Sequence, residues 1–206
     1  MGTRIFIFGE DGFTNIVLAN SLSMLGIDVL GEVDNEDIAL RQITHHCPDV
    51  ALLQVDLGHL KAVKIARTLR KNFPNLGIVI ATKASDIRLI GIERKDLPIG
   101  VLVSQISKHS DLDNLKFDIE QAPNCTTCKP DFHICEYLSD VQVETFRLMA
   151  EGNANSEIAK VRFVSEKSVE QMLARISLSL GLIFEHKFNS RVRLLNSYYE
   201  LVNGRK

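Results

Sequence analysis

The stretch PDVALLQVDLG, residues 48–58, carries the strongest indication of the fold. Its apolar part, Val50 to Leu53, is a continuous run and not an alternation, which is typical of a strand buried on both faces of a parallel sheet. The run ends on Gln54, and Asp56 stands two residues further on. In open α/β sheets, ligands and chemistry gather at the carboxyl ends of the strands. The first question is therefore what an uncharged amide does at this place.

The segments on both sides repeat the alternation of a short apolar run and an amphipathic stretch. Upstream, RIFIF (4–8) and DVLGEV (28–33) predict strands, and each is followed by a helical pattern. Downstream, LGIVIAT (76–82) and IGVLV (99–103) predict two more strands, with a short helix expected from Ser85 between them. Five β-α units in a row predict an α/β flavodoxin-like domain, in which a five-stranded parallel sheet is covered by helices on both faces.

The character of the chain changes after Gln121. The following stretch, 122–136, holds two prolines and polar residues with little periodicity, which predicts a linker. From Leu138 onward the pattern is purely helical. We therefore expect a sheet domain at 1–121, a linker at 122–136 and an all-α domain at 137–206.

The linker contains three of the four cysteines, in CTTCKPDFHIC (125–135). Cys125 and Cys128 form a C-x2-C pair, and His133 and Cys135 add two further ligand types of zinc. A zinc site, a redox pair and reduced thiols are the three alternatives. The reduced thiols are favoured, because only one C-x2-C is present and the close H-x-C end fits no common zinc finger. We expect no metal and no cofactor.

Composition indicates a soluble globular protein with a charge asymmetry. Of its 206 residues, 45% are hydrophobic and 24% charged. No apolar run approaches the roughly 20 residues needed to cross a bilayer, and the N-terminus reads as a strand and not a signal peptide. We therefore expect a cytoplasmic protein with no membrane partner. The net charge is −2, but from Lys160 onward nine basic residues stand against four acidic ones, which favours an anionic partner for the C-terminal part.

The all-α domain contains two helical patterns with clear ends. LSDVQVETFRLMAEG (138–152) opens with a capping box, Ser139 and Gln142, and ends at Gly152. VSEKSVEQMLARISLSLG (164–181) has Ser165 as the expected N-cap. Its apolar residues share one face, and the opposite face carries Lys167, Ser168, Glu170, Gln171, Ala174 and Arg175. A two-helix unit with an exposed polar second helix is what a helix-turn-helix needs to enter a major groove.

Residues 138–182 resemble the helix-turn-helix of LuxR/NarL-type transcription regulators. The matching positions include Leu138, Ser139, Ala150, Glu151, Gly152, Asn155, Glu157, Ile158, Ala159, Ser165, Glu166, Lys167, Val169, Arg175, Leu180 and Gly181. The resemblance implies a transcription factor that binds double-stranded DNA as a homodimer, with a further helix for dimerisation. NSRVRLLNSYYELV (189–202) fits that helix, with an expected apolar face of Val192, Leu195, Tyr199 and Val202.

The resemblance also assigns the DNA contacts. The family's base-reading positions fall on Glu170, Gln171 and Ala174, although basic residues are more usual at the first and last of these. The expected phosphate contacts are Lys160, Arg162, Lys167 and Arg175, with Ser168 on the same helix. Residues 136–206 carry ten basic and nine acidic residues. This weak surplus keeps an alternative open: a protein- or ligand-binding signalling module that has lost sequence-specific DNA binding.

The N-terminal domain resembles the receiver domain of the same response-regulator family. A working receiver uses an aspartate at the end of the third strand as phosphoacceptor, two acids after the first strand, a hydroxyl after the fourth and a lysine after the fifth. In this chain the corresponding positions are Gln54, Gly9 and Glu10, Thr82, and Ser104. An amide cannot act as the carboxylate nucleophile, so the resemblance implies a degenerate pocket and an atypical, orphan regulator that works without aspartyl phosphorylation.

Two alternatives for the N-terminal domain are left open. Asp56 is a substitute acceptor if the strand ends later, because a shift of two residues keeps the same face, although it does not restore the lysine. A small-molecule or protein signal on the pseudo-receiver is a second form of input. An enzyme has the least support, and no catalytic residue is expected, because neither a G-x-G-x-x-G run nor a P-loop is present.

Overall fold

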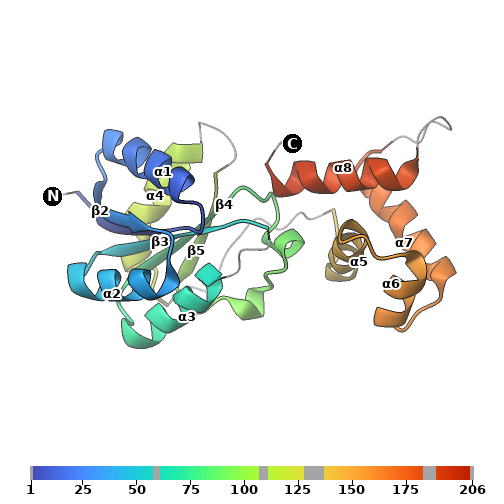
Figure 1. The fold of residues 1–206 in the computed structure, drawn as a ribbon, viewed down its shortest axis with the longest axis horizontal. Helices are drawn as coiled ribbons and strands as arrows, with labels where there is room; N and C mark the ends of the chain where they lie inside the picture. The colour runs from blue at the N-terminus through green and yellow to red at the C-terminus, as the bar shows by residue number, and fades with distance from the viewer. Residues whose placement is uncertain (1, 58–60, 107–110, 128–136, 183–188, 205–206) are drawn as a thin grey trace. The chain divides into compact units, whose positions relative to one another are not determined.

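The computed structural model describes residues 2–57, 61–106, 111–127, 137–182 and 189–204, and Figure 1 shows the fold. The chain divides into two compact units. The sheet unit comprises Met1–Lys83 and Ile92–Phe132, and the helical unit comprises Ala84–Gly91 and His133–Lys206. Residues 84–91 therefore belong to the helical unit, although they follow a strand of the sheet unit in the sequence.

The sheet unit contains a five-stranded parallel sheet in the order β2-β1-β3-β4-β5. The strands are β1 (Arg4–Phe8), β2 (Asp28–Val33), β3 (Val50–Val55), β4 (Gly77–Thr82) and β5 (Val101–Gln105). Every residue of β3 and β4 is buried, as the continuous apolar runs predict. This strand order is the flavodoxin-like one, so the predicted fold class is confirmed.

Four helices cover the sheet: α1 (Gly12–Met24), α2 (Glu36–His46), α3 (Lys61–Asn72) and α4 (Asp111–Gln121). In Figure 1, α1 and α4 lie on one face of the sheet and α2 and α3 on the other. The core under α1 and α4 joins strand residues such as Ile7, Leu52 and Val79 to Leu22 and Leu115 of the helices. The predicted N-cap Asn35 is confirmed, because its side chain accepts hydrogen bonds from the backbone of Asp37 and Ile38.

The connection between β4 and β5 differs from the prediction. The helix expected from Ser85 is absent, and two short 3-10 helices, η1 (Ile87–Ile90) and η2 (Arg94–Asp96), take its place. Asp86 caps η1, and Gly91, at φ 87°, ends it after one turn. Pro98 follows closely and disfavours a helix before it.

The helical unit contains α5 (Asp140–Ala150), α6 (Asn155–Val161), α7 (Glu166–Ser179) and α8 (Ser190–Val202). The capping box of Ser139 with Gln142 and the Ser165 N-cap are confirmed. On α8, Leu194, Tyr198, Leu201 and Val202 are buried within the helical unit. Of the predicted apolar face, Val202 is therefore buried, whereas Val192 and Tyr199 are exposed. The Tyr198 ring packs edge-on against Phe146 at 5.2 Å between centroids.

The linker prediction is only partly covered by the described residues. Ala122–Asn124 form a short 3-10 helix, η3, and Cys125 is disulfide-bonded, so the favoured interpretation of a reduced thiol is wrong at this position. Cys128, His133 and Cys135 lie outside the described residues. Within the described ranges, no three His, Cys, Asp or Glu side chains form a group that could hold a metal ion. None of the helices in those ranges is long and apolar enough to cross a membrane.

Candidate functional site

Gln54 lies at the carboxyl end of β3, and its side chain belongs to a buried pair of amides. The Gln54 Nε2 donates to Oδ1 of Asn15 at 2.6 Å. Asn15 is fully buried on α1, and its Nδ2 donates to the carbonyl oxygens of Gly9 at 2.7 Å and Val33 at 3.1 Å. The amide pair thus connects the ends of β1, β2 and β3 to α1. The sequence pointed to Gln54 but not to Asn15, which is 39 residues away from it.

Gly9 is the residue that leaves room for this pair. A Cβ atom built on Gly9 would lie 2.4 Å from the Asn15 Oδ1 and 2.9 Å from the Gln54 Cβ, closer than atoms of this kind approach. The sequence marks Gly9 as the position of a missing acid. Any side chain here would displace the amides, so Gly9, Asn15 and Gln54 form one packed arrangement.

The remaining pocket positions are engaged with neighbours. The Glu10 Oε2 lies 2.7 Å from Nζ of Lys61 on α3, and this hydrogen bond raises the pKa of Lys61. Thr82 and Ser104 are buried, at the end of β4 and on β5. The Ser104 hydroxyl hydrogen-bonds the Asp118 carboxylate, although burial is the larger effect and raises the pKa of Asp118.

Asp56, the alternative acceptor, lies just beyond the end of β3. Its side chain is 38% exposed, and its Oδ2 lies 3.9 Å from the Nζ of Lys83, which follows β4. Asp11 caps α1, and a hydrogen bond from the Thr14 hydroxyl holds its pKa below the usual value. Asp11 follows β1 and Asp56 follows β3, so both acids stand at the same edge of the sheet as Gln54.

The second candidate site is the exposed face of α7. Val169, Leu173 and Ile176 are buried against the rest of the helical unit. The opposite face of the helix is exposed and carries all six residues that the sequence assigns there: Lys167, Ser168, Glu170, Gln171, Ala174 and Arg175. The Ser168 hydroxyl lies 2.8 Å from that of Ser165, so it helps to fix the start of the helix. The face is polar, carries both charge signs, and is of the kind that can enter a groove of DNA.

The two remaining predicted contacts lie before α7. Lys160 is exposed at the end of α6, and its Nζ lies 2.7 Å from the Glu157 carboxylate. Arg162 is mostly buried: its guanidinium contacts the Glu144 carboxylate at 2.7 Å and donates to the Val141 carbonyl at 3.0 Å. Arg162 therefore ties the turn before α7 to α5.

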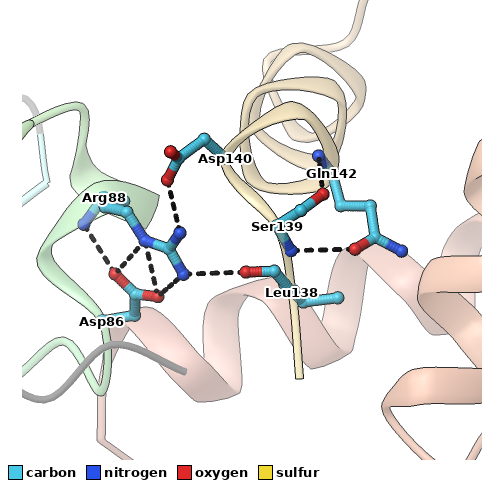
Figure 2. Close-up of polar contacts among 6 residues, drawn as sticks. All are labelled: Asp86, Arg88, Leu138, Ser139, Asp140 and Gln142. Carbon is cyan, nitrogen blue, oxygen red and sulfur yellow. Dashed lines mark hydrogen bonds and ion pairs between the residues drawn. The ribbon is translucent and has the colours of Figure 1, made fainter. Parts of the chain in front are cut away.

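Residues 84–91 are built into the helical unit through Arg88, as Figure 2 shows. The Arg88 guanidinium pairs with Asp86 at 2.7 Å, with Asp140 at 2.6 Å, and donates to the Leu138 carbonyl at 3.0 Å. The Asp86 side chain is fully buried and that of Arg88 is 9% exposed. Through Asp140 and Leu138, Arg88 therefore contacts the N-terminus of α5, next to the capping box of Ser139 and Gln142.

The same segment also contacts α8. The Tyr198 hydroxyl donates to the Leu89 carbonyl at 2.6 Å, and the Ser85 backbone N–H donates to the Leu201 carbonyl at 2.9 Å. Burial raises the pKa of Tyr198 to about 12. These contacts were not predicted from the sequence, because they join residues more than 100 positions apart.

Comparison with known proteins gives the context for both sites. No family model matches the chain. The DNA-binding transcriptional activator EvgA of Escherichia coli is 25% identical over 171 residues, which cover 77% of this chain and 82% of EvgA. The structure of the two-component response regulator RcsB in complex with DNA covers 98% of this chain and 100% of that chain, with a TM-score of 0.51 and 19% identity. The chain is therefore similar in sequence to a DNA-binding transcriptional activator, and similar in fold to a two-component response regulator.

A second solved structure has a similar fold over nearly the whole chain. A second RcsB structure, of two dimers bound to two parallel DNAs, covers 98% of this chain and 100% of that chain, with a TM-score of 0.50 and 17% identity. A Pseudomonas aeruginosa protein described as a putative transcriptional regulator is 23% identical over 189 residues, which cover 85% of this chain and 83% of that protein. The receiver-like sheet and the helices that follow it agree with the fold of RcsB.

Proposed function

We propose that this chain is a DNA-binding transcriptional regulator that acts as a homodimer and does not depend on aspartyl phosphorylation. The observation that carries the proposal is the Gln54–Asn15 amide pair at the position of a phosphoacceptor. A carboxamide lacks the nucleophilic oxygen of an ionised carboxylate. The regulators EvgA and RcsB support the DNA-binding part, and the RcsB dimers support two-fold pairing.

The exposed face of α7 is the proposed DNA contact. Lys167 and Arg175, with Lys160 of α6, are suited to phosphate contacts, which fix the position and orientation of the protein on the DNA duplex. Gln171 has an amide that can pair with adenine, Glu170 can accept from cytosine N4, and Ala174 leaves room for a thymine methyl group. Ser168 adds a hydroxyl at the start of the helix. Arg162 has its guanidinium committed to Glu144, so its role is to position the turn before α7.

We further propose that phosphodonors do not phosphorylate the residues at the carboxyl ends of the strands. Ser104 stands where a receiver has its lysine, and its hydroxyl is engaged with Asp118. Glu10 is paired with Lys61. Neither the nucleophile nor the cation that would neutralise a phosphoryl group is present at these positions.

The test compares DNA binding of the full-length protein with and without acetyl phosphate and Mg²⁺, by fluorescence anisotropy on its own upstream DNA and on a random duplex. We expect preferential binding of the upstream DNA, unchanged by the phosphodonor, and no added phosphoryl mass. Lys167→Ala should weaken binding, while Lys95→Ala, an exposed lysine of the sheet unit, should not. A phosphoryl adduct, lost in Asp56→Asn, would instead establish Asp56 as the acceptor.

A second candidate is a signalling module that binds a ligand without reading DNA sequence. Two observations favour it. Glu170 places a negative charge on the exposed face of α7, and the sheet unit has a cleft of about 450 Å³. The cleft lies before β3 and β4, at the edge opposite Gln54, and is lined by residues that include Cys47, Pro48, Phe73, Pro74 and Leu76. Its volume is in the range of small-molecule sites. Binding to both duplexes that is equally weak and insensitive to salt would favour this candidate.

A further inference from the structure

The cleft of about 450 Å³ in the sheet unit lies at the amino ends of β3 and β4. Four segments that are distant in the sequence meet there: the end of α2, the loop that leads into β3, the turn between α3 and β4, and η3. We call this hollow the β3–β4 cleft. Its walls, its charges and its hydrogen-bonding groups together indicate which molecule it can hold.

The walls of the β3–β4 cleft are apolar and stiff. Three of the chain's five prolines line it, namely Pro48, Pro74 and Pro123. Proline fixes its own backbone φ and has no N–H to satisfy, so each of these residues presents a rigid apolar surface. Phe73 and Leu76 add further apolar lining. A concave, mostly apolar and preformed hollow is the usual form of a small-molecule site.

Contacts from outside the cleft hold these walls in place. The Arg70 guanidinium donates to the carbonyl oxygens of Pro74 at 2.6 Å and Leu76 at 2.9 Å, which fixes the turn between α3 and β4. A Cβ atom built on Gly77 would lie 2.9 Å from the backbone N of Pro123. A side chain at Gly77 would therefore push η3 away from β4. The shape of the cleft follows from specific packing and not from a loose loop.

The charged groups near the cleft already have partners. Asp49 is the one charged side chain among the described residues that line it. Arg4 engages both Asp49 oxygens, through its backbone N–H at 2.9 Å and its guanidinium at 3.1 Å. The Arg70 guanidinium donates to backbone carbonyls as described above. Because a charged ligand would lose its hydration without gaining a free counter-charge, the cleft favours an uncharged occupant.

Two carboxamides can orient such an occupant. Asn72 and Asn75 line the cleft and are exposed, and within the described part of the chain their side chains make no hydrogen bond. Each amide offers both donors and an acceptor. Phe73 stands between them in the sequence, and its ring favours offset or edge-on contact with another aromatic ring. The cleft thus combines an aromatic wall with a polar rim.

From these observations we propose that the β3–β4 cleft binds a small, uncharged aromatic molecule, with its ring against Phe73 and its polar group at the Asn72 and Asn75 amides. The cleft has the volume of roughly 15 water molecules at about 30 Å³ each, which is ample for two fused rings. The proposal goes beyond the DNA-binding function proposed above. It concerns the sheet unit alone and holds whether or not α7 contacts DNA.

The test uses naphthol, an uncharged two-ring molecule, beside naphthalenesulfonate and naphthylmethylammonium, which carry opposite charges at the same ring position. Each is titrated into the isotope-labelled full-length protein at neutral pH, and the backbone amide shifts are followed by NMR. We expect naphthol to give saturable shifts, largest at the amides of Cys47, Asp49, Phe73 and Asn75. Both charged molecules should bind at least about tenfold more weakly, because their charges are not compensated in the cleft.

A pair of phenylalanine variants gives the matched control. Phe73→Ala should weaken naphthol binding about fivefold or more, because it removes the aromatic contact. Phe117→Ala makes the same change on α4, which covers the other face of the sheet, and should leave the affinity unchanged. Circular dichroism checks that both variants are folded. As a readout in the wild type, naphthol should slow the alkylation of the exposed Cys47 thiol by iodoacetamide, measured by peptide mass.

The outcomes separate this proposal from the proposed function. The absence of saturable shifts would overturn it, as would shifts that map away from the cleft or equal naphthol affinities of Phe73→Ala and Phe117→Ala. A charged molecule that binds as tightly as naphthol would overturn the uncharged class. Naphthol binding by a protein that does not bind DNA would support the cleft and contradict the proposed function, whereas DNA binding without naphthol binding would do the reverse.

Discussion

Gln54 and Asn15 face each other at the carboxyl edge of the sheet, with the Gln54 Nε2 2.6 Å from the Asn15 Oδ1. The bond joins β3 to α1 at the position where the resemblance to receiver domains places a phosphoacceptor. In this chain the side chain at that position has a structural partner. A buried hydrogen bond of this kind stabilises only if both amides are satisfied.

Removal of the Gln54 amide should destabilise the sheet unit. In Gln54→Ala the buried Asn15 Oδ1 loses its donor, which costs about 1–3 kcal/mol of unfolding free energy. Urea denaturation followed by hydrogen exchange of the β3 amides would measure the loss. Asn114→Ala, a change to an exposed amide on α4, should stay within about 0.5 kcal/mol of the wild type. Equal stability of the two variants would mean that the amide pair contributes nothing.

Arg88 should be needed for the stability of the helical unit. Arg88→Ala leaves the fully buried Asp86 carboxylate without its guanidinium, and loss of one partner of a buried pair costs about 3–5 kcal/mol. We expect the low end, because Asp86 also accepts the backbone N–H of Arg88 at 2.9 Å. Hydrogen exchange of α5 and α8 amides would report the change.

The control for Arg88 is another arginine–aspartate pair. Arg67 lies 3.0 Å from Asp96, and both side chains are substantially exposed. Since exposed pairs contribute about 0–1 kcal/mol, Arg67→Ala should change stability little. A similar small effect in Arg88→Ala would show that residues 84–91 are not held by the arginine.

The sequence did not predict that residues 84–91 belong to the helical unit. The caps at Asn35, Ser139 and Ser165 follow from local chemistry and were predicted correctly. The parallel sheet follows from the repeated β-α pattern. The apolar residues of 87–90 have no helical period of their own, since their burial is set by α5 and α8, far away in the sequence.

Among the candidate sites, too, only the features set by local sequence could be predicted. The exposed face of α7 could be predicted from helical periodicity alone, because core residues recur every three or four positions. The partner of Gln54 could not be predicted, because Asn15 is only one of several uncharged polar residues in α1. On α8 the sequence predicted Val202 but not Tyr198, because that helix has two adjacent apolar stripes and only tertiary packing selects Tyr198.

A fragment of residues 137–206 should therefore be less stable than the same helices in the full chain. It lacks Ile87, Leu89 and Ile90, all buried, and the carbonyl that accepts the Tyr198 hydroxyl. Burial of each such side chain contributes up to about 1.5–3 kcal/mol. Thermal unfolding by circular dichroism should give a lower Tm for the fragment, and a fusion that restores residues 84–91 through a glycine linker should raise it. An unchanged Tm in the fusion would contradict the prediction.

Tyr198 should make the helical unit sensitive to alkaline pH. Burial raises its pKa from 10.0 to about 12. Between these values the unfolded state has already lost the proton that the folded state retains, so unfolding is favoured as the pH rises. Stability should be full below pH 10 and fall between pH 10 and pH 12. Tyr198→Phe should remove this pH dependence, whereas Tyr199→Phe, a change to a 43% exposed neighbour, should keep it.

Glu170 should oppose DNA binding if α7 enters the groove. Its carboxylate lies on the exposed face of α7, and a negative charge there repels phosphates. Glu170→Lys should tighten binding to both upstream and random duplexes, and steepen the salt dependence by roughly one phosphate equivalent or more. Fluorescence anisotropy from low to moderate salt would measure both effects. The control is Glu120→Lys, which makes the same charge change on an exposed position of α4. If Glu170→Lys and Glu120→Lys raise the DNA affinity equally, the increase reflects net charge alone and α7 does not face the DNA.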